Sequence, residues 1–314
     1  MEQLGLRPLV ITGATGFLGR HLVARLAPLW KAEIFAIGRE PGAAPAGVRV
    51  VRGDLRDPAV FDGTIPPGSV VVHLAYDGEA GHDANVGMAV GLARACVRAR
   101  VERLVHVSTA NVVGVRDEAW VTETTLSRAT TDYQRTKLAV EDSLVRETDG
   151  RLVLVTLRPT SIFGRGGASL RKLARDLRTR FWAINYTRSS LFGRRPMNLV
   201  PVETCVAAIE FALSSARAAE DRLYLVSEDE SPDNNFRDVE RVLRMGLGLS
   251  DYPMPPLPLP AGWLRLALLA TGRLVVFPAT RFSGARLRSA GFLAPISFSA
   301  ALDRFARQAA GEQD

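Results

Sequence analysis

Short apolar runs alternate with helix-length segments through the first half of the chain. Several runs are apolar at every position, as a parallel sheet covered on both faces requires. The segments between them, such as 17–29, 84–100 and 133–147, are long enough for crossover helices. Strands alternating with such helices predict a doubly wound α/β fold. The predicted strands are 9–12, 34–37, 48–51, 70–74, 104–108 and 152–157.

This rhythm changes after about residue 160. Segment 170–180 is predicted as a basic helix, and 197–202 and 223–226 as short strands. A further helix is predicted over 231–248, because Ser231-Pro232-Asp233 is a helix-start signal. The proline-rich run 253–260 excludes a helix or a central strand and predicts an extended connector.

The length and the change in pattern allow two linked domains. The first would hold the alternating strands and helices of the first half, and the second the less regular remainder. The predicted boundaries are 1–164 with 197–228 for the first domain, and 165–196 with 229–314 for the second.

The composition of the 314-residue chain is that of a globular protein, with 47% hydrophobic and 23% charged residues. This excludes a disordered or collagen-like chain. The net charge of +7 favours anionic ligands such as a dinucleotide phosphate, although a solvated, arginine-rich surface gives the same count. We find no basic cluster interleaved with aromatic residues and expect no nucleic-acid partner.

The two cysteines, Cys96 and Cys205, lie far apart in apolar runs without a metal-binding spacing. A disulfide framework and a zinc site of the usual spacing are therefore excluded, and we expect no metal. The N-terminal residues do not resemble a signal peptide. The apolar stretch 263–279 is interrupted by Arg265 and Gly272-Arg273. Its uncharged runs are therefore shorter than the roughly 18 residues that a membrane-spanning helix needs. We expect a cytoplasmic protein without a membrane span.

A glycine-rich turn follows the first predicted strand. Gly13 permits the tight turn, Gly16 lets the backbone approach a pyrophosphate, and Gly19 lets the next helix pack closely on the sheet. The N–H groups and the dipole at the start of that helix favour an anion. The segment predicts a dinucleotide site, with cofactor contacts from Gly13, Thr15, Gly16, Phe17 and Leu18.

The ends of the next two strands predict the type of dinucleotide. Gly38 stands where an NAD site usually has an acidic residue, and Arg39 follows it. A guanidinium pairs with a 2′-phosphate, which favours NADP over NAD, unless Arg39 stacks on adenine or faces solvent. Asp54 is placed to accept a hydrogen bond from the adenine amino group, with Leu55 against the ring; alternatively, Asp54 caps the following turn.

Tyr133 and Lys137 are spaced i, i+4 and share one face of a predicted helix. This spacing is common, but here it follows a dinucleotide loop, four further strands and the hydroxyl-bearing strand end Ser108-Thr109. A phenol has a pKa of about 10 and is a poor proton-transfer catalyst at neutral pH. We expect the nearby ammonium of Lys137 to lower the pKa of Tyr133.

At this point the sequence resembles the extended short-chain dehydrogenase/reductase family, which includes NAD(P)-dependent sugar epimerases, dehydratases and ketoreductases. The resemblance implies that the first of the two domains is a Rossmann-type NAD(P)-binding domain and that the second is a smaller substrate-binding domain, with the active site in the cleft between them. The matching segments are TGATGFLG (12–19), GDL (53–55), HLAY (73–76), Asn85, VHVSTANVVG (105–114), Glu123, YQRTK (133–137), RPTSIFG (158–164), VPVETC (200–205) and AGF (290–292).

The resemblance also implies roles for individual residues. Thr109, with Ser108 as the alternative, would hydrogen-bond the substrate oxygen, Tyr133 would exchange the proton, and Lys137 would hold the nicotinamide ribose. Helices 84–100 and 133–147 would form the four-helix contact of a homodimer. Further cofactor contacts would come from Leu74, Ala75, Tyr76, Tyr133, Lys137 and Pro159.

Departures from the family pattern narrow the expected function. Ala110-Asn111 replaces the Asp-Glu pair of sugar dehydratases, and Val113 and Ser161 weaken the case for a nucleotide-sugar. We predict an NADP-dependent ketoreductase of a small carbonyl substrate, a sugar or nucleotide-linked sugar included. The alternatives are an NAD-dependent nucleotide-sugar epimerase and a catalytically silent NADP-sensing or scaffold protein. A lipid or steroid-like substrate held by the apolar stretches 263–269 and 274–277 is a fourth possibility.

Overall fold

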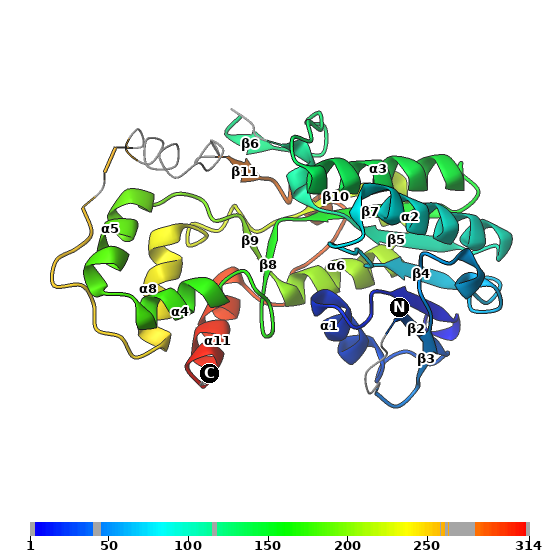
Figure 1. The fold of residues 1–314 in the computed structure, drawn as a ribbon, viewed down its shortest axis with the longest axis horizontal. Helices are drawn as coiled ribbons and strands as arrows, with labels where there is room; N and C mark the ends of the chain where they lie inside the picture. Colours follow the sequence, from blue (N-terminus) through cyan, green and yellow to red (C-terminus); the bar gives the residue numbers. More distant parts are fainter. Residues whose placement is uncertain are drawn as a thin grey trace.

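A seven-stranded parallel sheet forms the centre of the larger lobe (Figure 1). The computed structural model describes residues 4–39, 45–114, 118–257, 259–260, 263 and 280–311. The strand order is β10-β7-β5-β4-β1-β2-β3, which confirms the predicted doubly wound α/β fold. The strands are β1 Leu9–Thr12, β2 Ile34–Gly38, β3 Val48–Arg52, β4 Val70–His73, β5 Arg103–Val107, β7 Val153–Pro159 and β10 Leu223–Val226.

Helices cover both faces of this sheet, which is why β1, β4 and β5 are buried at every position and mostly apolar. Leu9 and Ile11 of β1 pack on the side of α1 (Phe17–Leu26) and α6 (Val202–Ser214). Val10, between them in the sequence, points to the opposite core, under α2 (Gly81–Arg98) and α3 (Asp132–Thr148). The chain therefore brings α2 and α3 side by side on one face.

A smaller lobe lies at the other end of the molecule and has its own apolar core (Figure 1). The core includes Phe163, Leu173, Val239, Phe298 and Leu302, which come from one strand and three helices. The strands β8 (Ser161–Phe163) and β9 (Leu199–Pro201) pair in parallel between the lobes. The helices of this lobe are α4 Arg171–Thr179, α5 Trp182–Phe192, α8 Phe236–Gly246 and α11 Phe298–Gly311.

The chain returns to the larger lobe after residue 280. Strand β11 (Arg281–Phe282) pairs with β6 (Trp120–Val121), and Leu287 and Phe292 join the core beneath the sheet. Part of the predicted second domain, residues 281–292, therefore packs against the larger lobe. The remaining short elements are η1 Leu4–Leu6, η2 Pro58–Phe61, η3 Ala110–Val113, α7 Ala218–Asp221 and α10 Ala285–Ser289.

One predicted helix start is wrong. α8 begins at Phe236 instead of at Ser231, because the side chain of Asn235 accepts a hydrogen bond from Asp238 N at 3.1 Å and caps the helix there. Residues 231–234 form a turn before it. Of the apolar stretch 263–279, all but Trp263 lies outside the described residues, as do the segments proposed for a lipid substrate. No helix within the described ranges is long and apolar enough to cross a membrane.

Candidate active site

The glycine turn after β1 has no room for side chains. Gly13 has a φ of +73°, and a Cβ there would lie 2.7 Å from Ala75 N. A Cβ on Gly19 would lie 2.2 Å from the carbonyl oxygen of Gly13. Gly16 caps α1 without a side-chain hydrogen bond, so the first-turn N–H groups lack a side-chain partner at this cap. This backbone fits the pyrophosphate of a dinucleotide.

A cavity of about 200 Å³ lies at the carboxyl ends of β1, β2, β3 and β4. This is the crevice in which doubly wound folds bind dinucleotides. Five of its lining residues were not predicted: Ile37, Gly38, Gly53, Asp77 and Met88. The predicted residues that line it are Gly13, Thr15, Gly16, Arg39, Asp54, Leu55, Leu74, Ala75 and Tyr76.

Arg39 stands at the rim of this cavity with an acidic partner. Its Nη1 donates to Oδ2 of Asp77 at 3.0 Å, and most of the guanidinium side chain is exposed. The amide of Asn85 holds the Asp77 backbone, accepting from Asp77 N at 2.9 Å and donating to Asp77 O at 2.8 Å. Sequence reasoning missed Asp77; its signal is an acidic residue directly after the HLAY segment at a strand end.

Asp54 caps the turn that follows β3, which is the alternative role predicted for it. Its Oδ1 accepts from the backbone N of Arg56 at 3.0 Å, and both carboxylate oxygens accept from the Arg56 guanidinium. The hydrogen bonds from Arg56 lower the pKa of Asp54 to about 2. Asp54 still lines the cavity, beside the buried side chain of Leu55, so its contact with adenine stays a prediction.

Tyr133 lies in the first turn of α3, which a capping box of Thr131 and Gln134 fixes. The residue is 43% exposed, and its ring meets that of Tyr76 edge to face, with centroids 5.2 Å apart. Burial raises the pKa of Tyr133, and a hydrogen bond with Thr109 opposes that rise. The expected lowering by Lys137 is therefore wrong for the protein without a cofactor.

Lys137 explains this difference, because its ammonium turns toward the sheet. Nζ donates to the carbonyl oxygen of Val107 at 3.0 Å and lies 5.4 Å from the ring centroid of Tyr76. Burial lowers the pKa of Lys137 to about 8, and the carboxylate of Glu141 opposes that shift. The ammonium is thus held at the end of β5, beside Tyr76 of the cavity wall.

Two buried groups next to Lys137 were also missed by sequence reasoning. Arg158 Nε donates to both carboxylate oxygens of Glu141, at 3.0 and 3.2 Å, and both residues are buried. The rings of His73 and His106 stack with centroids 5.2 Å apart. Burial, and next the charge of Lys137, lower the pKa of both histidines, so both are neutral at pH 7. The i, i+4 spacing of Lys137 and Glu141 was the signal for the first group.

The structure identifies the family once this geometry is compared with known proteins. The model of the NAD-dependent epimerase/dehydratase family matches residues 9–224, a span that holds the glycine turn, Thr109, Tyr133 and Lys137. The chain belongs to this family, which is part of the extended short-chain dehydrogenases/reductases. Its homologues and structural neighbours are NAD(P)-dependent epimerases, dehydratases and reductases.

Individual relatives of this epimerase/dehydratase member differ in what they do. The human short-chain dehydrogenase/reductase family 42E member 1 is 29% identical over 286 residues, which cover 80% of this chain and 70% of the relative. A 2-alkyl-3-oxoalkanoate reductase from Shewanella oneidensis is 32% identical over 171 residues, 49% of this chain and 44% of the relative. The structure of WbmG from Bordetella bronchiseptica with NAD has a TM-score of 0.71 at 19% identity, covering 96% and 93% of the chains.

The other predicted residues lie beside the cavity of this family member without lining it. A Cβ on Gly167 would lie 2.8 Å from Cζ of Phe17, so the Phe17 ring sits on the loop after β8. Leu18 packs against the core under the sheet, and Pro159 ends β7. Ser108 Oγ is buried without a hydrogen-bond partner among the described residues, whereas Thr109 Oγ1 accepts from Asn111 N at 3.3 Å.

Proposed function

We propose that this protein is an NADP-dependent ketoreductase of a small carbonyl compound. The observation that carries the proposal is the position of Tyr133, whose ring packs edge to face on Tyr76 of the cavity wall, with centroids 5.2 Å apart, one helical turn before Lys137. A bound nicotinamide supplies hydride chemistry. The phenol of Tyr133 would give its proton to the substrate oxygen, which the Thr109 hydroxyl would also hold. Lys137 of α3, whose ammonium lies at the end of β5, would hold the cofactor ribose.

Arg39 supports NADP as the cofactor. A 2′-phosphate would take the guanidinium from Asp77, because a doubly charged phosphate binds a guanidinium more strongly than one carboxylate does. Gly38 leaves no carboxylate at the strand end to repel that phosphate. The predicted contacts of Gly13, Thr15, Gly16, Leu74, Ala75 and Pro159 belong to the same proposal.

An NAD-dependent nucleotide-sugar epimerase is the second candidate, and Asp77 favours it. Its carboxylate neutralises Arg39 and would repel a 2′-phosphate that approached the same rim. WbmG, a structural neighbour, was solved with NAD. Cofactor that copurifies with the protein separates the candidates: tightly retained NAD supports the epimerase, and an empty site that takes up NADPH supports the reductase.

The catalytic proposal is tested by Tyr133→Phe, with Tyr186→Phe on α5 as the matched control. We expect Tyr133→Phe to lower kcat for NADPH-dependent reduction of a carbonyl panel by about a hundredfold or more, with the Kd for NADPH unchanged. Tyr186→Phe should keep both values. Full activity of Tyr133→Phe, or no uptake of either dinucleotide by the wild type, would contradict the proposal.

Three further proposals come from the sequence. The adjacent helices α2 and α3 would form the four-helix contact of a homodimer. The protein would work in the cytoplasm. The chain would divide its binding tasks between a cofactor domain around the sheet and a substrate domain around α4, α5, α8 and α11, with the segment 281–292 packed against the sheet.

A further inference from the structure

The positive charge of the chain is concentrated in one segment. Residues 164–202 contain nine Lys and Arg residues and a single acidic residue, Asp176, which gives this segment a net charge of +8. The whole chain carries +7, so the rest of the protein carries −1 in total. A charge asymmetry of this kind points to an anionic partner for the segment. The segment forms α4 and α5 in the smaller lobe, far from the seven-stranded sheet (Figure 1).

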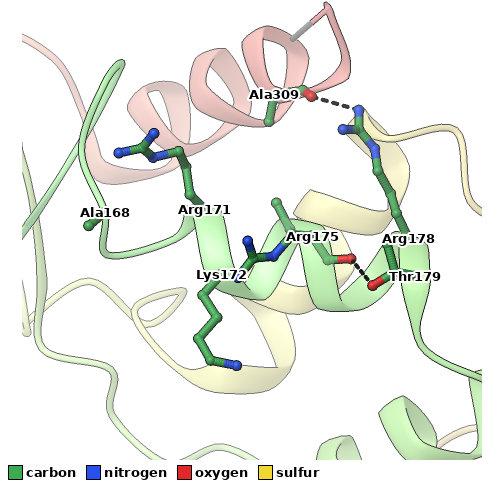
Figure 2. A pocket seen from close by; sticks show the side chains of 8 residues that line it. Ala168, Arg171, Lys172, Arg175, Arg178, Thr179 and Ala309 are labelled. Atoms are coloured by element: carbon green, nitrogen blue, oxygen red, sulfur yellow. Dashed lines mark hydrogen bonds between the residues drawn. The ribbon is translucent and has the colours of Figure 1, made fainter. Parts of the chain in front are cut away.

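The basic side chains of α4 line a cavity of about 350 Å³ that is separate from the nucleotide crevice. Figure 2 shows Arg171, Arg175 and Arg178 along the helix, with Ala309 of α11 on the far side. Arg171 is tethered to Gly167 O at 2.9 Å, and Arg178 to Ala309 O at 2.6 Å. The carbonyl oxygen that Arg171 binds carries no formal charge, so this guanidinium keeps its positive charge at the cavity.

Arg175 lies between these two tethered arginines in the sequence of α4. Within the ranges that the structure describes, Arg175 has no acidic partner, whereas Lys172 and Arg180 both pair with Asp176. Asp176 also accepts from Arg188 of α5 at 3.0 Å. One buried carboxylate therefore serves three cations, and the face around Arg175 keeps an excess of positive charge.

An apolar ridge follows this basic helix directly. Phe181 is 66% exposed, Trp182 49% and Ile184 47%, although aromatic and aliphatic side chains of this size are usually buried. The rings of Phe181 and Trp182 lie 5.8 Å apart between centroids. The connector predicted at 253–260 runs alongside: Tyr186 Oη donates to Pro255 O at 3.3 Å. The ridge consists of Phe181, Trp182, Ile184, Met254 and Leu257, all exposed.

The basic helix and the ridge are joined rigidly. Asn185 Nδ2 of α5 donates to the carbonyl oxygen of Asp176 on α4 at 3.1 Å, in addition to the Arg188 ion pair. Arg180 caps the end of α4, and Phe181 follows it in the chain. The basic helix and the exposed apolar side chains are therefore held next to each other at the end of the smaller lobe.

We propose that the surface formed by α4 and the ridge docks on an anionic phospholipid bilayer. Headgroup phosphates would bind the guanidinium groups of α4, and the side chains of the ridge would enter the boundary between headgroups and acyl chains. Exposed aromatic residues beside Lys and Arg are the composition with which proteins bind such an interface. The association would be peripheral, and the nucleotide crevice, at the other end of the molecule, would stay uncovered by the bilayer.

Two other partners fit this surface less well. A second copy of the chain would bring the same +8 segment against itself, and like charges at a contact repel. Single-stranded nucleic acid would use the arginines and stack its bases on Phe181 and Trp182. It would gain no stacking from Ile184, Met254 or Leu257, which suit acyl chains instead. A bilayer satisfies the charge, the aromatic rings and the aliphatic side chains together.

Vesicle sedimentation of the full chain tests the proposal. The wild type should sediment with phosphatidylglycerol–phosphatidylcholine vesicles at low salt, and much less with phosphatidylcholine alone or at high salt. Arg175→Glu with Arg178→Glu should weaken the partition at least about tenfold, because each basic group near the surface contributes. Phe181→Ser with Trp182→Ser should weaken it by a similar factor.

Matched controls separate this surface from net charge and from general hydrophobicity. Arg100→Glu with Arg217→Glu changes the net charge equally, and Leu126→Ser with Leu293→Ser removes exposed apolar side chains elsewhere. Both should bind like the wild type, and thermal unfolding verifies that each variant folds. Absent vesicle binding by the wild type, or equal losses in variants and controls, overturns the proposal. Dimerisation lost with Phe181→Ser and Trp182→Ser, or tighter binding of an oligonucleotide than of vesicles, does so too.

Discussion

Arg158 binds both carboxylate oxygens of Glu141 one helical turn beyond Lys137, and neither side chain of the pair is more than 8% exposed. A pair of this kind contributes little net stability, yet losing one partner is costly because the other charge stays buried. The pair also sets the charge around Lys137, since the carboxylate of Glu141 favours the ammonium that burial disfavours.

Glu141→Gln should therefore destabilise the protein by about 3–5 kcal/mol, because the Arg158 charge loses its partner. Adding Arg158→Met should recover much of that loss, since the unpaired charge is then removed as well. Urea unfolding of both variants and the wild type measures the two values. A double variant as unstable as Glu141→Gln would contradict this account of the pair.

Lys137→Met should change how stability depends on pH. The folded pKa of Lys137 is lowered to about 8 from an ordinary 10.5, so the buried ammonium costs stability below pH 8. Above that pH the folded protein releases the proton while the unfolded chain keeps it. The wild type should gain about 3 kcal/mol relative to Lys137→Met between those two pH values. If the unfolding free energies of the wild type and Lys137→Met differ by the same amount across this range, Lys137 is not a buried ammonium with a lowered pKa.

His106→Phe should make the protein more tolerant of acid. The pKa of the buried His106 is lowered well below its ordinary 6.5, so on acidification below that pH the unfolded chain takes up a proton that the folded protein does not. Wild-type stability should fall by about 1.4 kcal/mol per pH unit relative to the variant, whose ring still packs against His73. Parallel stability curves for the two proteins would contradict this.

Arg39→Ala and Asp77→Asn should move cofactor selectivity in opposite directions. Arg39→Ala should weaken the binding of NADPH by about tenfold or more relative to that of NADH, because a charge-assisted hydrogen bond to the 2′-phosphate is lost. Asp77→Asn should strengthen the binding of NADPH, since it frees Arg39 and removes a carboxylate that repels the phosphate. Fluorescence titration of both dinucleotides measures the ratio. An unchanged ratio in both variants would remove Arg39 from the 2′-phosphate proposal.

The sequence predicted the sheet well, because β1, β4 and β5 are mostly apolar and are followed by recognisable turns or helices. It predicted the glycine turn for a physical reason that the structure shows, namely the lack of room for a Cβ at Gly13. It did not predict the start of α8, because Asn235 and the earlier Ser231 are both good capping residues and tertiary contacts decide between them.

The candidate site was predicted less completely than the fold. The i, i+4 spacing put Tyr133 and Lys137 on one face but did not show that the ammonium turns to Val107 O. Asp77 and Arg158 are distant in the sequence from the groups that they bind, so the sequence did not show which residues they contact. Burial, which raises the pKa of Tyr133, is a property of the folded chain alone.

The return of the chain to the sheet after residue 280 has a consequence for synthesis. Leu287, Ala290 and Phe292 complete the core beneath β1 and β10, although more than sixty residues of chain separate them from β10. A nascent chain that has emerged from the ribosome as far as β10 still lacks these side chains. The growing polypeptide must therefore keep an apolar face of its sheet open until residues 287–292 have also emerged, a stage at which chaperones would bind it.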